Sequence, residues 1–129
     1  MEQDLRAYSP LALAFLGDGV YGLYIRDYLV RKGNARARSL HHTAANIVSA
    51  VSQAKAADHI EGILTEEEAA VMKRGANAHV SHQAKNASSY DYHKATGLEA
   101  LFGYLYLADR KERIEELTAL CIEAWEQLT

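Results

Sequence analysis

Apolar residues recur every three to four positions along most of the chain, and this periodicity predicts an all-α fold. The longest such segment begins at Ser9-Pro10, where serine is the N-cap and proline takes the first helical position. Gly33-Asn34 ends it, because these two residue types favour the backbone that follows a helix. A second helix is predicted from Ser39 to about Ile60.

Helical periods continue in the second half of the chain, with one interruption. Thr65 and Glu68 form a capping box, which opens a short third helix. The apolar period is lost from about Val80 to Tyr92, and this predicts a loop. Further helices are predicted from Lys94 to Leu107 and from Asp109, as N-cap, toward the C-terminus.

The composition narrows the class of protein. A length of 129 residues fits one domain, residues 1–129, with about five to seven helices. One proline and eight glycines are too few for an all-β fold rich in tight turns. The single cysteine, Cys121, excludes an internal disulfide framework and a four-thiolate zinc site. No apolar run is long enough for a membrane span, and no export signal is present, so we expect a cytoplasmic protein without membrane contact.

Charge is unevenly distributed, although the formal net charge is only −3. The segment from Arg31 to His42 holds four bases and no acid, and residues 69–98 hold four bases and one acid. The segment from Asp109 to Thr129 holds six acids and three bases. This asymmetry fits a protein with one anion-binding face and an opposite face that is exposed to solvent. Ordinary solvent-facing helix charges fit it as well.

Two acidic residues stand among small and apolar neighbours in the middle of predicted helices. Asp18 lies in a glycine-rich turn, and Glu99 lies between Gly97 and Gly103. A buried carboxylate costs free energy unless a cation or hydrogen-bond donors meet it. If the two helices pack through their glycines, the carboxylates come together and form a site suited to Mg²⁺. The alternatives are a surface position for Asp18 and an ion pair with Lys94 or an arginine for Glu99.

Two other kinds of site fit the sequence less well. The segment from Gly17 to Gly22 matches G-x-G-x-x-G, but a dinucleotide-binding turn needs a preceding strand and an acid about 20 residues later, and both are lacking. The histidines raise the possibility of zinc. However, His41 and His42 are adjacent and so point about 100° apart on a helix, while His79 and His82 lie where a helix frays.

The segments LAFLGDGVY at 13–21 and LEALFGYLYL at 98–107 together resemble the two signature helices of the ribonuclease III catalytic domain. The chain ends after its last helix of that kind, so it resembles the Mini-ribonuclease III subfamily, which consists of the catalytic domain alone. Asp18 matches the signature aspartate and Glu99 the late glutamate, which assigns both to catalysis and metal binding. Ala14 and Thr96 stand where ordinary ribonuclease III has two further carboxylates, a pattern typical of this subfamily, and the metal count stays open.

The resemblance implies Mg²⁺-dependent hydrolysis of double-stranded RNA, with Mn²⁺ as a substitute, giving 5′-phosphate and 3′-hydroxyl ends. The implied substrate is precursor 23S ribosomal RNA of the large subunit, with a ribosomal protein as an expected helper. A homodimer is implied as well, in which Phe15 packs into the partner. The residues expected to contact RNA are Lys73, Arg74, Asn77, Lys85 and Lys94.

Two functions of other classes stay open at this stage. One is a non-catalytic helical RNA-binding or ribosome-associated module, in which Asp18 and Glu99 are buried pair partners. The other is a different metal-dependent phosphohydrolase, in which histidines are the ligands. Mg²⁺-dependent cleavage of duplex RNA distinguishes the ribonuclease from both.

Overall fold

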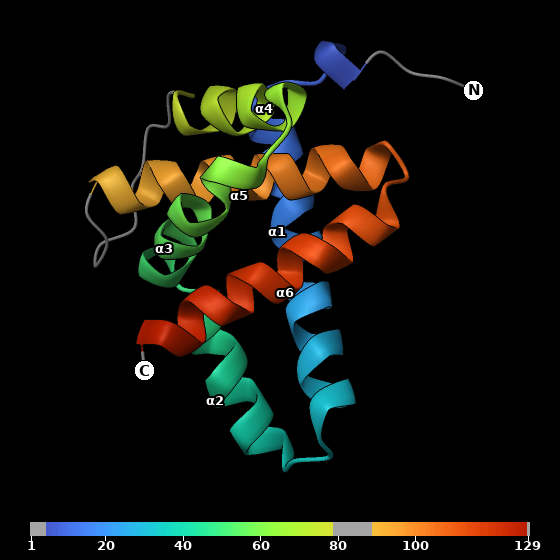
Figure 1. Cartoon of the computed structure of the whole chain (residues 1–129), viewed down its shortest axis with the longest axis vertical. Helices are drawn as coiled ribbons and strands as arrows, with labels where there is room; N and C mark the ends of the chain where they lie inside the picture. The colour runs from blue at the N-terminus through green and yellow to red at the C-terminus, as the bar shows by residue number, and fades with distance from the viewer. Residues whose placement is uncertain (1–4, 79–88, 129) are drawn as a thin grey trace.

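Helix α5 lies at the centre of the molecule. The computed structural model describes residues 5–78 and 89–128, and all regular elements in these ranges are helical, as predicted. Every residue of α5 from Ala95 to Leu105 is buried except Glu99, because small and apolar side chains surround the whole helix. Helices α1, α3 and α4 pack against it (Figure 1). The elements are η1 (Leu5–Ala7), α1 (Pro10–Lys32), α2 (Ala37–Ile47), α3 (Ala50–Ile60), η2 (Glu61–Ile63), α4 (Glu66–Ala76), α5 (Ser89–Leu107) and α6 (Lys111–Leu128).

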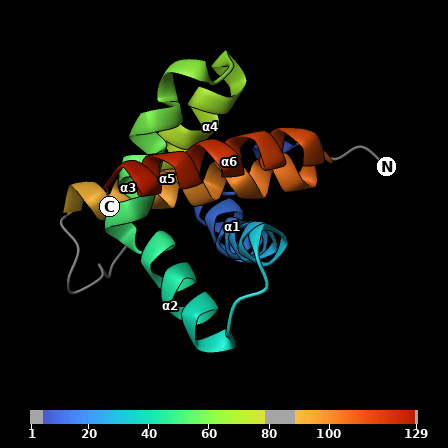
Figure 2. The ribbon, with the colours of Figure 1, turned by 60° about the horizontal axis from the view of Figure 1, so that its bottom comes forward.

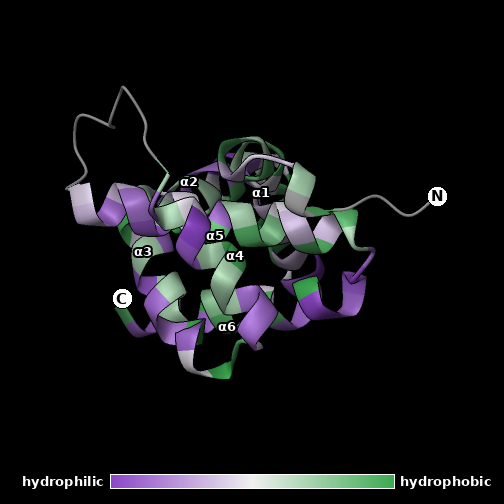
Figure 3. Cartoon of the chain, turned by 90° about the horizontal axis from the view of Figure 1, so that it is seen from above, coloured by the Kyte–Doolittle hydropathy of each residue, from purple (hydrophilic) through white to green (hydrophobic). Residues whose placement is uncertain are grey.

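The other helices are arranged around α5 according to their apolar faces. Helix α4 lies on one side of α5, and α2 lies on the far side, where it packs on the C-terminal half of α1 (Figure 2). Helix α6 packs mainly on α3, and its acidic residues are exposed. Hydrophobic residues predominate in α1 (Figure 3). Within the described ranges, no helix combines the length and the apolarity needed to cross a membrane.

Three of the predicted local signals are confirmed. Ser9 caps α1, because its Oγ accepts a hydrogen bond from Ala12 N at 3.1 Å. The capping box is formed in both directions, with 2.9 Å from Thr65 N to Glu68 Oε1 and 3.1 Å from Glu68 N to Thr65 Oγ1. Cys121 is a core residue, and burial raises the pKa of its thiol to about 12.

Three predicted boundaries are wrong. The single helix from Ser39 to Ile60 is two helices, because Ser49 Oγ accepts from Ser52 N at 3.3 Å and caps α3. The predicted loop is helical from Ser89 onward, while residues 79–88 lie outside the described part of the chain. Asp109 does not cap α6.

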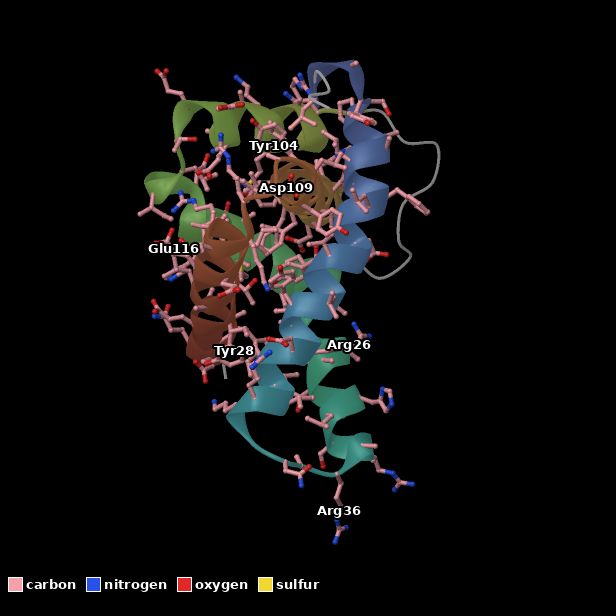
Figure 4. All side chains as sticks on the ribbon, turned by 90° about the vertical axis from the view of Figure 1, so that its right-hand side faces the viewer. Arg26, Tyr28, Arg36, Tyr104, Asp109 and Glu116 are labelled. Atoms are coloured by element: carbon pink, nitrogen blue, oxygen red, sulfur yellow. The ribbon has the colours of Figure 1, made fainter. Side chains whose placement is uncertain are left out.

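Asp109 instead ends α5, in a left-handed conformation with φ 57° (Figure 4). Its N–H donates to Tyr106 O at 3.1 Å, and the following N–H, of Arg110, donates to Leu105 O at 3.0 Å. This is the Schellman arrangement, in which an aspartate takes the usual place of glycine. The N-cap of α6 is Arg110, whose carbonyl accepts from Ile114 N at 3.1 Å.

Candidate active site

The site lies where α1 crosses α5 with their backbones in direct contact. A Cβ atom added to Gly17 would overlap the carbonyl oxygen of Glu99, and one added to Gly103 would overlap the carbonyl oxygen of Leu13. Only glycine permits this approach at either position. The prediction that the two helices meet through their glycines is therefore confirmed, and the contact fixes the segment that carries Asp18 beside Glu99.

Asp18 and Glu99 interact directly at this crossing. Burial, the negative charge of Asp18 and a hydrogen bond with Asp18 raise the pKa of Glu99 to about 8. The expectation of a buried Asp18 is wrong, because its side chain is exposed and Glu99 is the partly buried member. Two carboxylates held this closely share a proton or bind a cation. The alternative of an ion pair between Glu99 and Lys94 is also wrong, because Lys94 pairs with Asp58 at 2.9 Å and with Glu61 at 3.8 Å.

Gln53 is a member of this site that the sequence analysis missed. The side chain lies on the inner face of α3, is 3% exposed and lies close enough to Glu99 to lower the pKa of that carboxyl. Its Nε2 donates to Val48 O at 2.9 Å. Its Oε1 is buried and has no hydrogen-bond partner among the described residues. The signal in the sequence that could have revealed it is a polar residue on the same helix face as Ala57 and Ile60, which are buried.

The residues present fit a hydrated Mg²⁺ ion. Two carboxylates and a free amide oxygen are hard oxygen donors, and Mg²⁺ is bound through one or two carboxylates and otherwise keeps its waters. Ala14 and Thr96 are buried and add no carboxylate, and Thr96 Oγ1 donates to Tyr92 O at 2.9 Å. In the described part of the chain, no group of three or more histidine, cysteine or acidic residues is placed to hold a metal.

The residues proposed to contact RNA differ in their surroundings. Lys73, Arg74 and Asn77 are exposed at the C-terminal end of α4, and no ion pair joins the two bases to other described residues. Lys94 is 18% exposed and pairs with Asp58 at 2.9 Å, so it is poorly placed for a phosphate contact. Lys85 lies outside the described residues.

A second basic surface lies at the far end of α1 and on α2. Arg31 pairs with Asp27 at 2.9 Å, and Lys32 pairs with Glu126 at 3.2 Å. Arg36 lies at the tip between the two helices and points away from the body of the protein (Figure 4). Arg38 is likewise exposed, so these two residues are the freer bases of this surface.

The outer face of α1 is apolar and open to solvent. Phe15 is 85% exposed and Leu23 is 62% exposed, with Gly19 between them at intervals of four residues. A Cβ atom added to Gly19 would have no heavy atom within 4 Å. Large apolar side chains in such a stripe are typical of a surface that another molecule covers.

The fold and the carboxylate pair define a class of protein. Residues 11–110, which include both carboxylates, match the Ribonuclease III domain, and the chain belongs to this family of ribonucleases. It is 46% identical over 123 residues to the Mini-ribonuclease 3 of Enterococcus faecalis, an alignment that covers 94% of this chain and 93% of the relative. It is 42% identical over 127 residues to the Mini-ribonuclease 3 of Clostridium tetani, covering 98% and 84%.

A solved structure agrees with this assignment. The crystal structure of a protein from Fusobacterium nucleatum matches the fold with a TM-score of 0.85 and 31% sequence identity, over 95% of this chain and 98% of that one. The resemblance inferred from the two signature segments is therefore confirmed over nearly the whole chain.

Proposed function

We propose that this ribonuclease cleaves double-stranded RNA with Mg²⁺ as its cation, for which Mn²⁺ can substitute. The observation that carries the proposal is the contact between Asp18 and Glu99 at the glycine crossing of α1 and α5. Because Glu99 is partly buried and Asp18 is exposed, a cation held by both would stay open to an RNA phosphate. The names of the Mini-ribonuclease 3 relatives support a ribonuclease activity.

In this reaction Asp18 and Glu99 supply the oxygen ligands. A bound Mg²⁺ would lower the pKa of a water molecule and offset the charge of the phosphodiester. Glu99 has to lose its proton to bind a cation, and its pKa of about 8 means that cation binding releases a proton near neutral pH. Hydrolysis would leave 5′-phosphate and 3′-hydroxyl ends.

The proposed substrate is the precursor of 23S ribosomal RNA, which places the protein in ribosome biogenesis in the bacterial cytoplasm. A ribosomal protein as helper rests on the family resemblance alone and stays a prediction. The test is incubation of purified protein with this precursor RNA, with Mg²⁺, with Mn²⁺ and with a chelator, followed by mapping of the ends. Absence of cleavage with both cations would contradict the proposal, and binding without cleavage would favour the non-catalytic RNA-binding module.

The exposed end of α4 is the proposed contact with RNA phosphates. A Cβ atom added to Gly75 would lie 2.7 Å from the Cβ of Ala100, so the turn of α4 that follows Lys73 and Arg74 packs on the α5 segment that carries Glu99. We expect Lys73→Ala with Arg74→Ala to weaken binding across RNA sequences and to lower the salt dependence by roughly two counterions, one for each lost phosphate contact. Fluorescence anisotropy at several salt concentrations measures both quantities.

Lys111→Ala is the matched control for this pair, because Lys111 is exposed on the acid-rich α6. It should leave affinity and salt dependence unchanged. If the double variant binds like the wild type, the RNA-binding face would have to be moved to Arg36 and Arg38.

The apolar face of α1 is the proposed dimer interface. A two-fold axis near Gly19 would bring Phe15 of one copy against Leu23 of the other, since each lies four residues from that glycine. We expect a dimer in light scattering, and we expect Phe15→Glu to weaken it at least ~100-fold, because two large apolar contacts are lost. Leu128→Glu replaces an exposed apolar residue at the end of α6 and should stay dimeric. A monomeric wild type at micromolar concentration would remove this prediction.

A further inference from the structure

Gln53 occupies a buried position, where an apolar side chain would cost less free energy to remove from water. It is 3% exposed in α3, and the fully buried Ala57 and Ile60 share its helix face. An amide removed from water costs free energy for each polar atom that finds no hydrogen-bond partner. The core of α3 gains nothing from an amide here, so the reason for it lies in what the amide contacts.

The amide connects the carboxylate site to the break between α2 and α3. On one side, Nε2 donates to the carbonyl of Val48, the residue that ends α2, at 2.9 Å. On the other side, the amide lies close enough to Glu99 to lower the pKa of that carboxyl. The backbone at Val48 is itself fixed, because its N–H donates to Ala44 O at 3.0 Å. Glu99 is thus linked through a single buried side chain to a fixed point on another helix.

The remaining atom of the amide has no partner. Gln53 Oε1 is buried without a hydrogen bond from any described residue. The two carboxylates of the site offer no donor in their ionised form, whereas the waters around a hydrated cation do. An acceptor left free in this position fits a site that is completed by such waters.

We propose that Gln53 is a positioning residue, which holds the Glu99 carboxylate in the orientation that binds the catalytic cation. This inference rests on the proposed function, because it requires a divalent cation at Asp18 and Glu99. Gln53 adds no charge and touches no RNA in this role. It acts on the affinity for the cation and leaves the affinity for RNA unchanged.

The test is the variant Gln53→Met, which keeps the length of the side chain and removes the amide group. We expect its affinity for Mg²⁺, measured by calorimetry without RNA, to fall 10–100-fold, the usual effect of losing a residue that orients a metal ligand. Cleavage should recover in part at high Mg²⁺, the KM for RNA should stay unchanged, and Gln53→Glu should not restore the wild-type affinity because it cannot donate to Glu99.

Thr118→Val is the matched control, because Thr118 is also 3% exposed and its Oγ1 donates to Ile114 O, on its own helix. It should bind Mg²⁺ like the wild type. Wild-type affinity in Gln53→Met would overturn the positioning role. A wild-type protein that neither binds Mg²⁺ nor cleaves RNA would overturn the proposed function itself.

A measurement on the wild type keeps the inference testable if the variant does not fold. The side-chain amide resonances of Gln53 should shift during a Mg²⁺ titration followed by NMR, while those of the exposed Gln127 should not. The shift should disappear in Glu99→Gln. Gln53 resonances that stay unchanged at saturating Mg²⁺ would contradict the proposal.

Discussion

Asp18→Asn is expected to lower the rate of duplex RNA cleavage at least ~10³-fold, because it removes one of two charged ligands from a cation that stabilises the transition state by several kcal/mol. The same change should stabilise the cation-free protein at alkaline pH. The pKa of Glu99 in the folded chain, about 8, lies above its usual value of 4.5, so the folded state holds this proton more tightly. The free energy of unfolding therefore falls as the pH rises from about 4.5 to about 8. Asp18→Asn should make this fall smaller, because it removes the negative charge beside Glu99.

Initial rates with saturating Mg²⁺ and melting temperatures with chelator at pH 6 and pH 9 measure these two effects. Asp27→Asn is the control, because Asp27 is exposed on the same helix and pairs with Arg31 at 2.9 Å. It should cleave normally. Near-normal turnover of Asp18→Asn would refute the metal-ligand role, and a melting temperature below that of the wild type at pH 9 would refute the charge repulsion. Glu99→Gln should behave similarly in cleavage, with partial rescue at high metal concentration.

The second large effect is expected from Gly17→Ala. The new methyl group would overlap the carbonyl oxygen of Glu99, and this overlap involves backbone on both helices, so neither can yield by changing a side-chain rotamer. We expect a loss of at least ~3 kcal/mol in the free energy of unfolding, at the upper end for overpacking, together with loss of cleavage. Urea denaturation followed by circular dichroism measures this change.

Gly33→Ala tests whether the effect comes from the crossing. Gly33 follows the same helix in an extended conformation, with φ −175°, and an added Cβ would meet nothing within 4 Å. Its free energy of unfolding should change by less than ~0.5 kcal/mol. If Gly17→Ala were equally mild, the close contact between α1 and α5 would be wrong.

Local signals made much of the fold predictable. The Ser9 cap and the Thr65–Glu68 capping box are hydrogen bonds between residues three positions apart, so the sequence contains both partners. The start of α5 was not predictable in this way. Tyr90 in its first turn donates to the Asp58 carboxylate of α3 at 3.3 Å, a contact between residues distant in sequence. Tertiary contacts of this kind can hold a polar segment in a helix that its own pattern does not indicate.

The candidate site was likewise predictable from the sequence only in part. Asp18 and Glu99 could be paired from sequence, because the glycines near both indicated a close helix crossing. Which carboxylate is buried depends on how the neighbouring helices cover the crossing, and this was predicted incorrectly for Asp18. Gln53 could not be placed, because its role depends on the break between α2 and α3, which the apolar period did not reveal.

The central position of α5 has a consequence for synthesis on the ribosome. Helix α1 is made first, but α5, against which it packs most extensively, is complete only about 75 residues later. At about 5–20 residues per second, the interval is on the order of 4–15 s. Throughout this time the surface of α1 that packs on α5 lacks its covering, and the outer apolar face is exposed as well. The nascent chain is therefore a candidate client for chaperones until α5 has emerged from the ribosome.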